Sequence, residues 1–145
     1  MIIVRPYVPP FLPMGMTKSG NQNVTYNTGT AHVKLLNWTP HASYPSSVII
    51  SDGLIASGPK QSVAITYAMN YVIQHGSVIV GVHIYKNGTL IGSKTESTSY
   101  NATRTISGTI TTDVAIGDTI SMYAGNASTV TAMTVNGTST NFTVV

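Results

Sequence analysis

The sequence predicts an all-β protein, an antiparallel β-sandwich of jelly-roll topology with an extended, proline-rich N-terminal arm. Thr, Ser, Asn and Gly dominate a chain in which only 8% of the residues are charged, and this mixture favours pleated strands and tight turns. About eight to ten short alternating segments follow one another between turn signals, as in sandwiches and jelly rolls. No helix of ordinary length is visible, and 145 residues fit one domain with a proper core.

The first sixteen residues are apolar but cannot form a helix. Prolines at positions 6, 9, 10 and 13 remove backbone donors and fix φ, so we expect an extended arm. Such an arm would lie in a groove of a partner or add to an exposed sheet edge. The residues expected to contact the partner are Ile2, Ile3, Val4, Tyr7, Val8, Phe11, Leu12 and Met14.

A polar segment rich in Gly and Asn, residues 17–30, follows the arm and resembles a linker. We therefore divide the chain into an arm and linker, residues 1–30, and a jelly-roll domain, residues 31–145. Regular structure is expected to begin near Ala31, with a first strand over residues 32–38. A loop over residues 39–45 and a tight turn at Asp52-Gly53 complete this part of the chain.

The strongest strand signal lies at residues 62–73, where apolar side chains recur at every second position. A second strand is expected over residues 78–85. The Asn87-Gly88 pair after it is typical of a type I′ hairpin, because both central residues need a positive φ. Residues 90–95 should therefore pair back onto residues 80–85.

The rest of the chain predicts further short strands. Residues 104–112 alternate, Ile116-Gly117-Asp118 forms a turn, and a strand starts at Ile120. Residues 130–135 and 142–145 are the last strands, separated by Asn136-Gly137. Because the chain ends inside a strand, we expect the C-terminus to be tied into a sheet.

The sequence lacks the residue patterns that nucleic-acid binding, metal binding, membrane insertion and acid–base catalysis require. Seven Lys and Arg are spread along the chain and give a net charge of +3, without the basic patch that nucleic-acid binding needs. There is no Cys, no zinc spacing among the four His, and no apolar run that could span a membrane. The four acidic residues form no evident acid–base pair, and turn roles suit Asp52 and Asp118 best. We expect neither an enzyme nor a bound metal or cofactor.

The aromatic residues admit two interpretations. Eight Tyr and one Trp could stack on sugars. Tyr67 and Tyr71, however, are in phase with the apolar face of their strand, which favours the core or a subunit interface. The candidate interface residues are Tyr67, Tyr71, His83 and Tyr85. Trp38 is expected to close one end of the barrel.

Several short motifs resemble a known group of proteins. They comprise Asn37-Trp38, Tyr44-Pro45, the segment from Ser51 to Ile55, the alternating strand from Val63 to Tyr71, the Lys-Asn-Gly-Thr hairpin from Ile84 to Leu90, and the Gly-Asp turn from Ile116 to Ile120. Over residues 31–145 the chain is similar to small phage virion proteins with a jelly roll like the complement globular head and tumour necrosis factor. This resemblance implies about ten strands, assembly as a trimer, and no catalytic residue.

The absence of Cys and of an export signal agrees with a virion protein that folds in the bacterial cytoplasm and leaves by lysis. We expect a non-enzymatic, trimeric capsid decoration protein on the virion surface, held to the major capsid protein or to a tail component by its arm. The alternative is a minor tail protein or fibre-tip knob that binds host-surface glycans.

Overall fold

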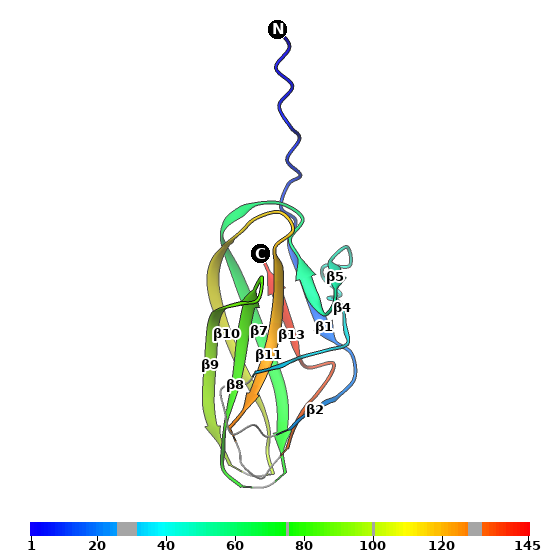
Figure 1. Ribbon diagram of the computed structural model, residues 1–145. Coiled ribbons are helices and arrows are strands. Elements are labelled where there is room, and N and C mark those ends of the chain that lie inside the picture. The colour runs from blue at the N-terminus through cyan, green and yellow to red at the C-terminus, as the bar shows by residue number, and fades with distance from the viewer. Residues whose placement is uncertain (26–31, 75, 100, 128–131) are drawn as a thin grey trace.

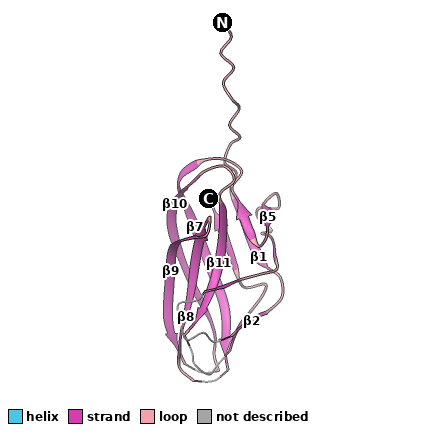
Figure 2. Ribbon diagram, viewed as in Figure 1, coloured by secondary structure: helices cyan, strands magenta, loops and turns pink. Residues whose placement is uncertain are grey.

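A computed structural model describes residues 1–25, 32–74, 76–99, 101–127 and 132–145. The described residues form strands and loops without a helix (Figure 2). None of them forms a helix of the length and hydropathy that crossing a membrane requires. The prediction of an all-β sandwich is confirmed.

Two antiparallel sheets face each other across one core (Figure 1). In the first, which we call sheet A, the long β7 pairs with β10 on one side and with β12 and β13 on the other; β2 pairs with β12, and β1 lies between β13 and β4. Sheet A contains β1 (Met14–Lys18), β2 (Gln22–Val24), β4 (Trp38–Pro40), β7 (Lys60–Ile73), β10 (Thr103–Val114), β12 (Met133–Val135) and β13 (Asn141–Val144).

The second sheet, sheet B, has the order β5-β6-β11-β8-β9, and β3 also pairs with β11. Its strands are β3 (Val33–Lys34), β5 (Val48–Ile50), β6 (Gly53–Ile55), β8 (Val78–Lys86), β9 (Thr89–Thr98) and β11 (Thr119–Asn126). Apart from the consecutive pairs β5–β6 and β8–β9, neighbouring strands come from distant parts of the chain, as they do in a jelly roll.

The period-two pattern of β7 is confirmed. The side chains from Val63 to Ile73 at odd positions are buried, and those between them, from Ala64 to Val72, are half-buried or exposed. The hairpin between β8 and β9 is confirmed as well, because Asn87 and Gly88 have φ values of 51° and 79°. The C-terminus is tied into sheet A, since the backbone N–H of Val145 donates to the carbonyl of Ala64.

The expectation that regular structure begins near Ala31 is wrong. Strands β1 and β2 precede it, and Met14 and Met16 of β1 are 3% and 0% exposed in the core. The reason is non-local: β1 pairs with β13, which closes the sheet only when the end of the chain has folded.

Two other local expectations also need correction. The segment 32–38 is not one strand, because Asn37 has a φ of 62° and separates β3 from β4. The turn between β5 and β6 is made by Ser51 and Asp52, with φ values of 48° and 57°, so Gly53 belongs to β6. The expected strand from residue 130 lies partly outside the described residues, and its described part starts at Met133.

Candidate functional site

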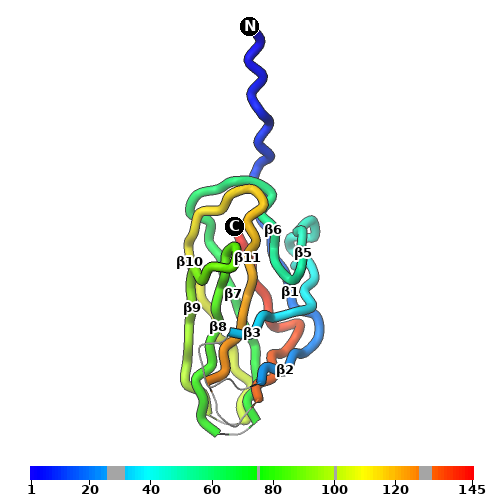
Figure 3. Tube along the Cα trace, in the orientation of Figure 1, coloured from blue at the N-terminus to red at the C-terminus, as the bar shows by residue number. Residues whose placement is uncertain are grey.

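The free part of the N-terminal arm, residues 1–8, leaves one end of the sandwich (Figure 3). Its apolar side chains face solvent: Ile2 is 92% exposed, Ile3 74%, and Val4 and Tyr7 both 83%. Val8 is also more than half exposed. Covering such aliphatic and aromatic groups is favourable, because it removes their apolar surface from water.

Residues 9–13, which we call the arm root, lie on the body of the protein. The backbone N–H of Leu12 donates to Ser57 Oγ at 2.9 Å, and Lys60 Nζ lies 5.1 Å from the centroid of the Phe11 ring. Phe11 is partly buried against the core. Gly58 lies directly beneath Pro9 and Pro10, where a Cβ atom would collide with their backbone. The root is therefore seated on the Ser57–Lys60 segment.

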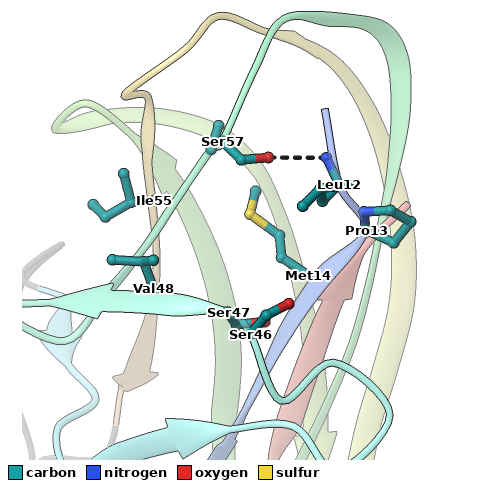
Figure 4. Close-up of a pocket in the computed structure, with 9 residues that line it drawn as sticks. Leu12, Pro13, Met14, Ser46, Ser47, Val48, Ile55 and Ser57 are labelled. Carbon is teal, nitrogen blue, oxygen red and sulfur yellow. Dashed lines mark hydrogen bonds between the residues drawn. The ribbon is translucent and has the colours of Figure 1, made fainter. Parts of the chain in front are cut away.

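An apolar hollow of about 110 Å³ opens beside the arm root (Figure 4). Met14 and Ala56, both nearly fully buried, contribute to its lining, as do Leu12 and Val48, which are about half exposed. The complete lining consists of Leu12, Pro13, Met14, Ser46, Ser47, Val48, Ile55, Ala56 and Ser57. Every lining residue is uncharged, so the hollow suits an aliphatic group.

The wall of the hollow is held by hydrogen bonds between side chains and backbone. Ser47 Oγ accepts from the N–H of Gly15 at 2.9 Å and donates to the carbonyl of Tyr44 at 2.8 Å. The loop that carries Ser46 and Ser47 is thereby fixed to β1. The hollow is present in the folded protein without a ligand, because hydrogen bonds fix its walls: Ser47 is bonded to Gly15 and Leu12 to Ser57.

The predicted arm residues thus separate into three groups. Ile2, Ile3, Val4, Tyr7 and Val8 form the exposed arm, whereas Phe11 and Leu12 belong to the root. Met14 is a buried residue of β1, so its inclusion among the arm contacts is wrong. Met14 follows Pro13 and is apolar like the arm residues before it. The sequence therefore did not show that the arm ends and the sheet begins at this residue.

The four predicted interface residues do not lie together: two are in the core and two on the outer face of sheet B. Tyr67 and Tyr71 are buried in the sandwich, and the Tyr71 hydroxyl donates to Glu96 Oε1 at 2.6 Å. Burial, with the carboxylate beside it, raises the pKa of Tyr71 to about 12. His83 and Tyr85 point away from the core, on the outer face of sheet B, because Val82 and Ile84, which alternate with them along β8, are core residues.

His83 belongs to a cluster that also contains His32, Tyr85 and Tyr123. The rings of His32 and His83 stack with centroids 3.3 Å apart and planes 8° from parallel, and His32 Nδ1 is 2.7 Å from the Tyr85 hydroxyl. The ring centroids of Tyr85 and Tyr123 are 4.4 Å apart. Sequence reasoning missed His32, which precedes β3 and lies far from His83 in the chain.

Burial, and then the neighbouring His32, lower the pKa of His83 to about 4. Burial also lowers the pKa of His32. Both rings are consequently neutral at pH 7. A hollow of about 150 Å³ lies beside them, lined in part by Gly81, Gly125 and Thr95. Gly81 and Gly125 leave the space that the His83 ring occupies, because a Cβ at either position would meet His83 Nε2.

The outer face of sheet A carries small, uncharged side chains. On β7 these include Ala64, Thr66, Ala68 and Asn70, each half-buried or exposed. The facing side chains of β10, at residues 105, 107, 109 and 111, are Thr or Ser and exposed. Thr66 Oγ1 and Thr109 Oγ1 are 3.1 Å apart across the two strands. This surface, which we call the threonine face, has the small side chains that allow close approach of another surface.

Among the described residues, no three His, Cys, Asp or Glu side chains lie close enough to hold a metal ion. Asp118 has the turn role expected for it, since its Oδ2 accepts from the N–H of Ala115 at 2.8 Å and its Oδ1 from Asn87 Nδ2 at 2.7 Å. Trp38 is 8% exposed and packs edge-on against Phe142, so it fills the core.

No protein-family model matches the sequence, and no curated protein matches it either. A solved structure, the Eiger tumour necrosis factor of S. frugiperda, is similar with a TM-score of 0.66. The match covers 94% of this chain and 92% of that chain, at 9% sequence identity. At this identity the likeness shows a shared jelly-roll fold and carries no function with it.

Proposed function

We propose that this chain is a non-enzymatic structural protein of a phage virion, a trimeric capsid decoration protein attached to the particle through its N-terminal arm. The observation that carries the proposal is the exposed arm, in which Ile2 to Val4 are 74–92% exposed while the domain behind them buries its apolar side chains in one core. A protein that cements others needs a reaching, adhesive segment and a stable body, and this chain has both.

The arm is suited to tight docking. Its prolines restrict the free chain, so less conformational entropy is lost when a partner orders it. The root is already seated on Ser57 and Gly58, which sets the point from which residues 1–8 reach outward. Apolar side chains on an extended backbone can fill a groove or follow a sheet edge of the major capsid protein.

The threonine face supports the trimeric part of the proposal. Its side chains are small and uncharged, so this face can lie against a different surface of the neighbouring copy around a three-fold axis without burying an unpaired charge. We propose this face, in place of Tyr67 and Tyr71, as the contact between copies. The variant Ala68→Arg should yield a folded monomer, whereas Ile79→Arg on the outer face of sheet B should leave the oligomer unchanged; analytical ultracentrifugation distinguishes the two.

A second candidate function is a minor tail protein or fibre-tip knob that binds host-surface glycans. The hollow beside His32 and His83 favours it, because neutral imidazoles and the Thr95 hydroxyl can exchange hydrogen bonds with sugar hydroxyls. Binding of a glycan array by the wild-type protein, and its loss in Thr95→Val, would support this candidate over decoration.

The experiment that tests the proposal is to image intact particles and to compare two truncations. Removal of residues 1–8 should leave a folded protein that no longer joins the particle. Removal of residues 1–16 also deletes Met14 and Met16 from the core, and should prevent folding. Many copies on the head lattice agree with decoration, and a few copies at the tail agree with the second candidate. Normal incorporation of the shorter truncation would overturn attachment through the arm.

A further inference from the structure

We infer that the apolar hollow at the arm root is the binding site for the arm of a second copy of this chain. The inference rests on the proposed function, because both take the arm as the attachment element. It identifies a second copy of this chain as a partner of the arm. In this arrangement one branched side chain of the segment Ile2–Val4 of one copy fills the hollow between Leu12, Val48 and Ala56 of another. Copies are then linked to one another through exchanged arms.

The hollow and the arm are complementary in size and chemistry. The hollow holds about 110 Å³ and no charged residue lines it. For comparison, an apolar cavity of about 150 Å³ accommodates a benzene molecule, so this hollow has the size for one branched aliphatic side chain. The arm presents three such side chains in succession, Ile2, Ile3 and Val4, with 74–92% of each exposed.

The arm that fills the hollow comes from another copy. A chain cannot easily fill its own hollow, because Leu12 and Pro13 of its root already form one wall. To reach the hollow of the same chain, the arm would have to make a turn at residues 5–8, so that residues 1–4 ran back alongside Pro9 and Pro10. Neither proline has a backbone N–H that could bond to such a returning segment. Extended instead, the eight free residues span about 25 Å at about 3.1 Å per residue, enough to reach a neighbour.

The surface around the hollow is exposed and apolar. Val48 and Ile50 of β5 are 53% and 59% exposed, and β5 is the edge strand of sheet B. An extended arm that places a side chain in the hollow can also lie along this edge, where strand addition supplies backbone hydrogen bonds. The arm and β5 thus both present apolar side chains on an extended backbone, so they can pair along their length.

Because the chain has no Cys, disulfide trapping tests the inference cleanly. One copy carries Ile2→Cys, Ile3→Cys or Val4→Cys, and a second copy of different length, through a cleavable tag, carries Val48→Cys. After mixing and mild oxidation, we expect a covalent pair containing one chain of each length. The matched control places the Cys at Ile79, which is 52% exposed, nearly the same as Val48 at 53%. Ile79 is the second residue of β8, which begins at the end of the sandwich far from the arm (Figure 1). That control should give at least tenfold less of the mixed product.

A chain that carries both Ile3→Cys and Val48→Cys separates exchange from self-docking. Linkage between chains supports the inference, whereas linkage within one chain, or equal yields with the Ile79 control, overturns it. Ser46→Trp, which blocks the exposed side of the hollow, should abolish the specific product. The incorporation of the 1–8 truncation into particles is scored separately. If the mixed disulfide forms but the truncated protein still joins the particle, attachment through the arm is refuted. If the truncated protein fails to join the particle but no mixed disulfide forms, only arm exchange is refuted.

Discussion

Acid should destabilise this protein through His83, a buried histidine on the outer face of sheet B. The perturbation is a shift from pH 7 to pH 4, compared between the wild type and His83→Phe, which keeps a flat ring against His32. Burial lowers the pKa of His83 from an ordinary value near 6.5 to about 4. Between these two values the unfolded chain binds more protons than the folded chain, so the free energy of unfolding falls as the pH falls.

The magnitude follows from the two pKa values. At about 1.4 kcal/mol for each pKa unit, the difference corresponds to about 3 kcal/mol, fully present above pH 6.5 and lost by pH 4. The pKa of His83 is shifted by burial and by the neighbouring His32, both of which lower it, and no carboxylate contributes to the shift. Lys34 Nζ donates to the Ser51 carbonyl and Lys94 Nζ to the Ser107 carbonyl. Protonation of His83 therefore meets no carboxylate that would offset its burial.

Urea denaturation at a series of pH values measures the effect. The wild type should lose about 3 kcal/mol more than His83→Phe between pH 7 and pH 4, because all other titrating groups are common to both proteins. Ser93→Ala, a change beside His83 on β9 that removes no titrating group, should keep the steepness of the wild type. A difference below about 1 kcal/mol between wild type and His83→Phe would refute the reasoning.

Three further predictions concern the core and the arm root. Phe142→Ala removes a fully buried ring that packs against Trp38 and should lower the free energy of unfolding by about 3–5 kcal/mol in urea. Tyr71→Phe removes the hydroxyl that donates to Glu96 and should cost about 1–3 kcal/mol in the same assay. Gly58→Ala introduces a Cβ where Pro9 and Pro10 lie, so limited proteolysis should cleave the arm root faster while the melting temperature changes little.

Each of these predictions has an outcome that contradicts it. A loss below about 1 kcal/mol in Phe142→Ala would mean that the ring is not part of the core. Equal stability of Tyr71→Phe and the wild type would mean that the hydroxyl is solvated. Unchanged cleavage of the root in Gly58→Ala would show that residues 9–13 are not seated on Gly58.

The strand content and the local turns could be predicted because their signals are local. The alternation over residues 62–73 identified β7 and its buried face, and Asn87-Gly88 identified the hairpin between β8 and β9. These signals depend on side-chain period and on φ, which neighbouring residues determine. Tyr67 and Tyr71 could be assigned to the apolar face of β7, but the same pattern fits a core and a subunit interface.

The candidate sites could not be predicted, because each is made of segments far apart in the chain. The hollow joins residues 12–14 to residues 46–48 and 55–57, and the stacked rings join His32 to His83. Nothing in the neighbourhood of Ser46 or His32 indicates these contacts. The sequence therefore pointed to the arm but missed the surface beside it.

By itself, then, the sequence determined that this protein is all-β, which residues of its longest strand face inward, and that its first residues cannot be helical. Only the tertiary structure decided where the arm ends. Met14 and Met16 look like arm residues in the sequence, yet they are core residues because β13, at the other end of the chain, pairs with β1. Strand pairing is a non-local interaction, so the register that buries a side chain exists only once both strands have met.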